Sequence, residues 1–134
     1  MAGNKTFHCQ LITPEAAMVD VHAEQVVFTA HDGEVGILLN RAPLLCKLGI
    51  GEMRVTTEQG TQRFYVDGGF AHVMGNEVTI LTERALAAED IDPAEAKQEL
   101  ADLAQPGERT LEDAQRRELM KRRARTKIKL AKKK

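Results

Sequence analysis

The sequence predicts an all-β N-terminal sandwich of about nine or ten strands over residues 1–86, followed by a C-terminal antiparallel α-helical hairpin over residues 87–134. Nine of the ten glycines precede residue 87, where they separate short runs rich in Val, Ile, Thr and Phe. After Thr82 the composition changes to Ala, Glu and Leu. Short β-rich runs between glycine turns are typical of a sandwich or barrel, and the later segment carries helix signals.

The expected strands are short and alternate with turn signals such as His31-Asp32-Gly33 and Gln59-Gly60. They are Phe7–Thr13, Val19–Ala23, Gln25–Ala30, Val35–Leu39, Leu44–Leu48, Met53–Glu58, Arg63–Val66, Phe70–Met74 and Val78–Leu81. Val26-Val27-Phe28 is apolar throughout, which predicts a strand that is covered on both faces. The run from Gly49 to Arg54 begins like a dinucleotide-binding motif but leads into a strand, and is interpreted as a bulged loop.

Two helices are predicted from their end signals. Asp92 is an N-cap residue, with Pro93 at the first helical position and Glu95 three residues after the cap, so the first helix begins near residue 93. It stops before Gln105-Pro106-Gly107. Thr110 caps a second helix from Leu111 to about Ala131, and the short link makes the two helices antiparallel.

Charge is divided unevenly along the chain. Residues 1–86 carry 6 basic and 10 acidic groups, residues 87–108 have a net charge of −6, and residues 109–134 have +9. The second helix has a thin apolar stripe, which we expect at Met120, Ala124, Ile128 and Ala131. Because residues 109–134 are strongly basic, the partner of the second helix should be acidic. The simpler alternative is a basic tail paired with the first helix, but +9 exceeds what that helix can neutralise.

Residues for catalysis or metal binding are not recognisable in the sequence, so we expect no enzyme activity. It contains no serine, which excludes a serine nucleophile. Cys9 and Cys46 fall within strand patterns and are expected to be buried, reduced thiols. No metal site is expected, because the spacing of the histidines matches no zinc signature. These are His8, His22, His31 and His72. No secretory signal or membrane span is expected.

Three stretches in order resemble a known family. The first is Asp32-Gly33-Glu34-Val35-Gly36-Ile37-Leu38 followed by Asn40-Arg41-Ala42-Pro43-Leu44-Leu45, the second is Val66-Asp67-Gly68-Gly69-Phe70-Ala71 with Asn76–Leu81, and the third is Asp90-Ile91-Asp92-Pro93 with Arg122–Thr126. Together they resemble the ε subunit of the F-type ATP synthases of bacteria and chloroplasts. The resemblance spans nearly the whole chain.

The resemblance implies a non-catalytic subunit of the central stalk in a proton-translocating ATP synthase, peripheral on the cytoplasmic face of the bacterial inner membrane. It implies a sandwich that contacts the γ subunit and the c-ring, and a hairpin that inhibits ATP hydrolysis by contacting the catalytic β subunits. The implied ring and stalk contacts are Asp32, Gly33, Glu34, Arg41, Ala42 and Pro43, and the implied β-subunit contacts are Arg122, Arg123 and Arg125.

Two positions depart from the family pattern. Arg41 stands where the family usually has His, and Glu95 stands where members whose hairpin binds ATP carry Arg. A carboxylate in place of a guanidinium disfavours phosphate, so no bound ATP or other cofactor is expected.

The lysine- and arginine-rich tail leaves a second hypothesis open, a basic-tailed nucleic-acid or ribosome-binding adaptor. Against it, residues 121–134 contain no aromatic side chain for base stacking, and the sandwich is acidic. A third hypothesis is binding to a membrane surface. Against it, the apolar stripe of the second helix contains no Trp or Phe.

Overall fold

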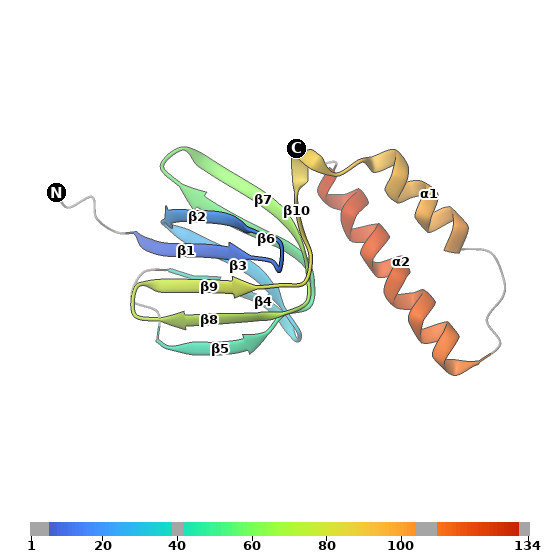
Figure 1. Cartoon of the computed structure of the whole chain (residues 1–134), viewed down its shortest axis with the longest axis horizontal. Helices are drawn as coiled ribbons and strands as arrows, with labels where there is room; N and C mark the ends of the chain where they lie inside the picture. Colours follow the sequence, from blue (N-terminus) through green and yellow to red (C-terminus); the bar gives the residue numbers. More distant parts are fainter. Residues whose placement is uncertain (1–5, 39–41, 104–109, 132–134) are drawn as a thin grey trace.

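The computed structural model describes residues 6–38, 42–103 and 110–131, and they form two five-stranded sheets followed by two helices (Figure 1). The first sheet has the order β2-β1-β9-β8-β5, and the second has the order β10-β7-β6-β3-β4. The strands are β1 Phe7–Ile12, β2 Ala17–Ala23, β3 Gln25–Ala30, β4 Gly33–Ile37, β5 Leu44–Lys47, β6 Ile50–Thr57, β7 Gly60–Asp67, β8 Phe70–Met74, β9 Glu77–Leu81 and β10 Ala85–Ala87. The predicted sandwich and helical hairpin are confirmed.

The core lies between the two sheets. Strand β1 shows the expected alternation, because Phe7, Cys9 and Leu11 are buried while the residues between them are partly exposed. Strand β1 pairs antiparallel with β2 and parallel with β9, and the other pairings are antiparallel. Alternating burial on both sheets produces one continuous hydrophobic core, as in other sandwiches.

Three local interpretations of the β domain are wrong. Val27 is only half-buried, so β3 is not covered fully on both faces. Gly49–Arg54 is not a loop, because β6 begins at Ile50 and contains Gly51, where a side chain would collide with Thr29 of β3. Cys46 is partly buried rather than buried, because it lies on the edge strand β5.

The sequence also missed β10. Ala85–Ala87 pairs with Val66, Tyr65 and Phe64 of β7, although its composition favours a helix. Ala85 and Ala87 pack against the main core, so this strand is part of the sandwich. A short 3-10 turn, η1 (Ala88–Asp90), then leads to the helices.

The two helices begin where their caps predict. Helix α1 spans Pro93–Leu103, and the Asp92 carboxylate accepts hydrogen bonds from the backbone N–H groups of Ala94 and Glu95 at 2.9 and 3.3 Å. Helix α2 spans Leu111–Ala131, and the Thr110 hydroxyl accepts a hydrogen bond from the N–H of Asp113 at 3.1 Å. These bonds satisfy backbone donors that the first turn of a helix leaves unpaired.

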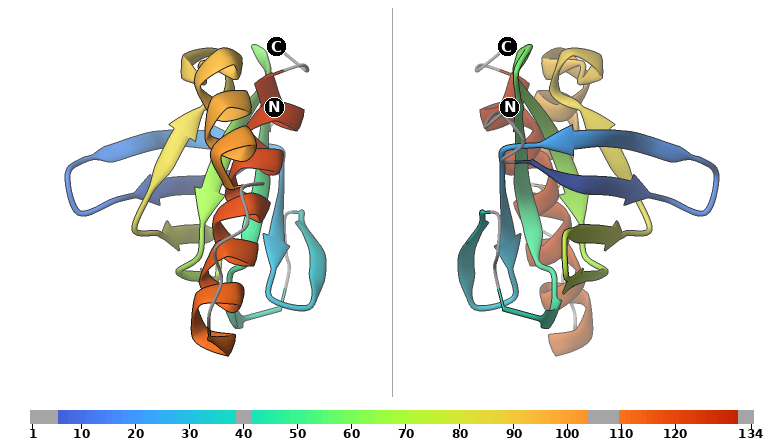
Figure 2. Two further views of the ribbon diagram at one scale, coloured as in Figure 1. Left: turned by 90° about the vertical axis from the view of Figure 1, so that its right-hand side faces the viewer. Right: turned by 90° about the vertical axis from the view of Figure 1, so that its left-hand side faces the viewer.

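The hairpin lies beside the sandwich, and α2 packs against β6, β7 and η1 as well as α1 (Figures 1 and 2). The expected apolar stripe on α2 is only partly correct. Ala124 and Ala131 are buried and Ile128 is half-buried, but the Met120 side chain is exposed. Leu130, which is not part of the expected stripe, is buried as well. Only the C-terminal half of α2 therefore contributes buried residues.

Candidate functional site

The two loops expected to contact the ring and the stalk lie at different ends of β5. The Asp32 turn between β3 and β4 adjoins the end of β5, because the N–H of His31 donates to the carbonyl of Lys47 at 2.9 Å. Ala42 and Pro43 come directly before the first residue of β5. The structure therefore does not bring Ala42 and Pro43 together with the β3–β4 turn.

Both loops are accessible. Asp32, Gly33 and Glu34 are exposed, and the φ angle of Gly33 is +144°, a conformation that favours glycine. The Glu34 carboxylate lies 3.8 Å from the Arg54 guanidinium of β6, a loose surface pair. Ala42 and Pro43 are exposed, whereas Arg41 lies outside the described residues.

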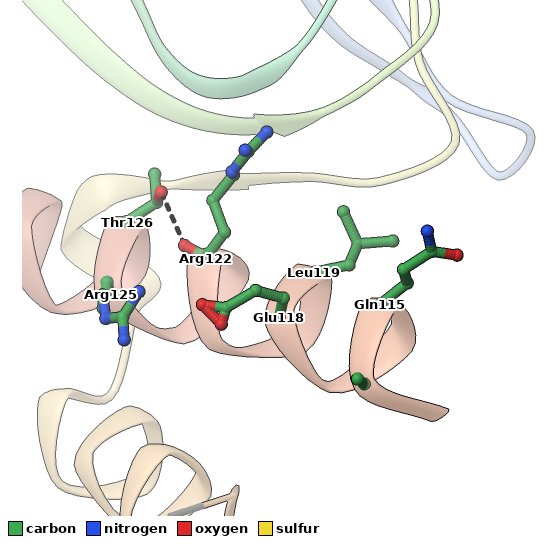
Figure 3. Close-up of a pocket in the computed structure, with 7 residues that line it drawn as sticks. Gln115, Glu118, Leu119, Arg122, Arg125 and Thr126 are labelled. Carbon is green, nitrogen blue, oxygen red and sulfur yellow. Dashed lines mark hydrogen bonds between the residues drawn. The ribbon is translucent and has the colours of Figure 1, made fainter. Parts of the chain in front are cut away.

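The three arginines predicted as β-subunit contacts have different surroundings. Arg122 and Arg125 are exposed and line one hollow on α2 together with Glu118 and Thr126 (Figure 3). Arg123 points elsewhere, and its Nε atom lies 2.9 Å from Oδ2 of Asp67 at the end of β7. The helical spacing explains why Arg123 points away from Arg122 and Arg125, because residues three apart share a face and adjacent residues do not.

Asp67 is the charged centre of the contact between α2 and the sandwich. Its side chain is only 11% exposed, compared with 37% for Arg123. The Tyr65 hydroxyl donates a hydrogen bond to Asp67 at 3.2 Å. The Arg123 Nε–H does not point at the carboxylate in hydrogen-bond geometry, so this contact is an ion pair defined by its short distance.

Tyr65 joins the charged contact to an apolar one. Its ring is 1% exposed and packs with Ile91, Leu130, Ala131 and the partly buried Ile50. The Lys127 ammonium lies 5.4 Å from the centre of the ring, in cation–π range. Burial raises the pKa of the Tyr65 hydroxyl, and the neighbouring Asp67 carboxylate raises it further, so the hydroxyl stays protonated and remains a donor.

We call the contact formed by Ile50, Tyr65, Asp67, Ile91, Arg123, Lys127, Leu130 and Ala131 the α2 seat. Sequence reasoning gave a contact or packing role only to Arg123 and Ala131 among its members, and each of these roles was different from the one in the seat. One signal was available, because Tyr65 is the only tyrosine and alternates with Asp67 on one face of a strand.

The histidines do not assemble a metal site. His8 of β1 contacts Asp20 of β2 through Nε2, and its Nδ1 lies 3.7 Å from Glu77 of β9. The ring of His22 is centred 5.7 Å from that of His8. Within residues 6–38, 42–103 and 110–131, no group of three or more His, Cys, Asp or Glu side chains is arranged to hold a metal ion. Burial raises the pKa of the Cys9 thiol to about 12, which keeps it unreactive at neutral pH.

No helix within the described ranges is both long enough and apolar enough to cross a membrane.

Fold and site together define a β-sandwich protein with an appended helical arm, whose basic second helix rests on one sheet through a small seat. Residues 6–88 match the family model described as the β-sandwich domain of the ATP synthase delta/epsilon chain. The chain belongs to this family, as an epsilon subunit of F-type ATP synthase.

Relatives cover almost the whole chain. The ATP synthase epsilon chain of Rhodopirellula baltica is 38% identical over 120 residues, 90% of this chain and 94% of the relative. The chloroplastic ATP synthase epsilon chain of Cyanidioschyzon merolae is 40% identical over 87% of this chain and 92% of its own length. These relatives confirm the resemblance that the sequence motifs indicate.

Solved structures share the fold. A chain in the cryo-EM structure of the Euglena gracilis mitochondrial ATP synthase, OSCP/F1/c-ring, aligns with a TM-score of 0.72 at 19% identity, over 96% of this chain and 78% of that one. A chain of the Tetrahymena thermophila mitochondrial ATP synthase, central stalk and c-ring, aligns with a TM-score of 0.68 at 16% identity, over 92% of this chain and 95% of that chain. At these identities the likeness concerns the fold alone.

Proposed function

We propose that this chain is a non-catalytic subunit in the central stalk of a proton-translocating F-type ATP synthase, peripheral on the cytoplasmic face of a bacterial inner membrane. Its sandwich couples the γ subunit to the c-ring, and α2 inhibits ATP hydrolysis by contacting the catalytic β subunits. The family membership supports the first part, and the Tetrahymena thermophila structure with a similar fold is of a central stalk and c-ring.

The observation that carries the inhibitory role is the mismatch between the charge of α2 and its small seat. Residues 109–134 have a net charge of +9. The seat engages Arg123 and Lys127, whereas Arg122 and Arg125 are exposed on another side of the helix. An exposed cationic face with this spacing is suited to an acidic protein surface. Arg123 becomes available to such a surface only when it leaves Asp67.

Neutralising the exposed arginines tests this role. The double substitution Arg122→Gln and Arg125→Gln in a reconstituted complex should raise the rate of ATP hydrolysis, because the acidic partner loses two attractive contacts. Each exposed ion pair contributes about 0.2–1 kcal/mol, so the double variant should show a larger effect than either single one. Raised salt should partly mimic the variant through screening.

The matched control is Arg116→Gln, which removes another exposed arginine of α2, one that pairs with Asp113 on its own helix. The rival role is a permanently folded hairpin in which α2 only pairs with α1. That role predicts a double variant with lower thermal stability and an unchanged ATPase rate, and this outcome would overturn the inhibitory proposal.

The coupling role is tested at the β3–β4 turn. Glu34→Lys should weaken assembly or coupled ATP synthesis without unfolding the sandwich, because the side chain is 60% exposed and its one described ion pair, at 3.8 Å from Arg54, is loose. Glu58→Lys, at the exposed β6–β7 turn, is the control for a change of charge alone. Full assembly and normal proton-coupled synthesis with Glu34→Lys would remove the turn from the proposed interface.

Co-purification separates the proposal from the nucleic-acid and membrane-surface hypotheses. The tagged full chain should bring down an ATP-hydrolysing membrane complex. Recovery of RNA without ATPase subunits would favour the adaptor hypothesis, and retention on pure lipid vesicles would favour membrane-surface binding.

A further inference from the structure

One edge of the sandwich carries a strand that is only half covered. Strand β7 spans Gly60–Asp67, but β10 pairs only with Phe64, Tyr65 and Val66. The chain then continues into η1, which also contacts β7. In the described part of the chain, no strand pairs with Gly60–Arg63 on that side. An uncovered edge presents backbone donors and acceptors that can pair with another chain.

Two backbone hydrogen bonds fix the direction of these backbone groups. The N–H of Asp67 donates toward β10, to the carbonyl of Arg84 at 3.1 Å, whereas the N–H of Gly68 donates toward Gly49, beside β6, at 3.1 Å. Backbone direction alternates along a strand, and the β6–β7 register runs without a shift to the Thr57–Gly60 pair. The N–H and C=O groups of Thr61 and Arg63 therefore point out of the edge.

A cleft of about 660 Å³ lies along this edge. It is lined by β7 of one sheet, by β2 of the other and by η1. Apolar lining comes from Phe64 and Val19, each 5% exposed, and from Ala87. The inward side of an added strand would therefore meet apolar surface, and its backbone would meet the free groups of β7.

We propose that the edge of β7 at Gly60–Arg63 binds one extended peptide segment of a partner protein, which adds to the sheet as a continuation of the line of β10. Its inward side chains are small and apolar, and its ends are basic. The basic ends follow from the net charge of the lining, where Asp20, Glu89 and Asp90 outnumber Arg63.

A second copy of this chain is a poorer fit than a single segment. Strand β2 forms the opposite wall of the cleft, and η1 lines it as well. A whole second sandwich would have to bring its own sheet into this space, whereas one extended strand needs only about 4.8 Å beside β7. Strand addition of this kind gains affinity from backbone bonds and specificity from alternate side chains.

Binding of a defined probe tests the proposal. The probe is fluorescein-labelled Lys-Thr-Val-Thr-Val-Thr-Lys with blocked ends, added to the purified full chain and followed by anisotropy. We expect saturable binding that falls at least tenfold when alternate backbone nitrogens of the probe are methylated. It should also fall when glutamates replace the terminal lysines. Equal binding of the methylated probe, or no binding of the parent probe, would overturn the proposal.

The protein side is tested with Thr61→Pro, which removes one outward N–H group and is tolerated sterically at an edge. It should weaken probe binding severalfold, while Gln62→Ala, whose backbone faces β6, should not. Hydrogen exchange of the free chain should be fast at Thr61 and Arg63, slow at Gln62 and Phe64, and slowed at the first pair by the probe. Unchanged exchange on adding the probe, or sedimentation showing dimers through this edge, would contradict a peptide site.

Discussion

Asp67 and Arg123 form an unequal pair, because the carboxylate is 11% exposed and the guanidinium 37% exposed. Removing the arginine leaves a nearly buried carboxylate whose remaining described partner is the Tyr65 hydroxyl. Removing the carboxylate leaves a guanidinium group whose side chain is partly exposed, although its Nε atom is buried. The cost of an unpaired group depends on how far it is desolvated. The two substitutions should therefore differ in effect.

We predict that Arg123→Gln destabilises the docked hairpin by about 1–3 kcal/mol, and Asp67→Asn by less. Hydrogen exchange of the amides in the C-terminal half of α2 measures the docking free energy directly. Arg122→Gln is the control, because it removes an exposed arginine one position earlier. Equal protection in the Arg123 and Arg122 variants would show that the ion pair does not hold the helix.

The His8 pair makes stability depend on pH. The hydrogen bond with Asp20 raises the pKa of His8 above its usual 6.5, with Glu77 also raising it, whereas the contact with His8 lowers the pKa of Asp20 below 3.8. The histidine contribution is complete below pH 6.5 and is lost as pH rises through the raised pKa. The aspartate contribution is present above pH 3.8 and is lost as pH falls through the lowered pKa.

We predict that His8→Gln lowers the urea midpoint more at pH 5.5 than at pH 8.5. Both side chains are solvent-accessible, so the difference should be modest. His22 also faces the His8 ring, and His22→Gln should leave most of the pH dependence in place, because no hydrogen bond joins it to Asp20 in the described residues. A pH-independent effect of His8→Gln would show that the pair does not titrate as described.

At the scale of elements, the sequence predicts best what local signals determine. The bounds of α2 follow from the Thr110 cap, and those of β3 and β8 follow from β-rich runs between turns. Strand β10 was missed because Ala85-Leu86-Ala87 favours a helix, and pairing with β7 overrides that preference. The α2 seat was missed for a related reason, since Asp67 and Arg123 are far apart in sequence and no local pattern joins them.

The β10 pairing bears on which fragment of the chain can fold alone. A fragment that stops near Arg84 lacks Ala85 and Ala87, which pack against the core. We predict that a fragment ending at Asp90 unfolds cooperatively in urea and is more stable than one ending at Arg84, which loses its edge strand. The family model, which matches residues 6–88, is consistent with the longer fragment. Equal stability of both would show that β10 contributes nothing.

On the scale of the whole molecule, the two parts have opposite electrostatic character. The acidic sandwich holds the basic α2 through one carboxylate and one small apolar cluster, and the arginine pair Arg122 and Arg125 stays exposed. The family and the charge contrast were visible in the sequence. The sequence did not show how much of α2 the sandwich covers, because this depends on the packing of α2 against β6 and β7.

The inhibitory role of α2 is tested most directly by the ATPase rate of a reconstituted complex containing the chain truncated after Arg109. Truncation removes α2 with its exposed arginines but leaves every strand, so the complex should still assemble. We predict that ATP hydrolysis is severalfold faster than with the full chain at low salt, and that the difference is smaller at high salt, where screening weakens the contact of α2. An ATPase rate that is the same with the truncated and the full chain, in a fully assembled complex, would contradict the inhibitory role.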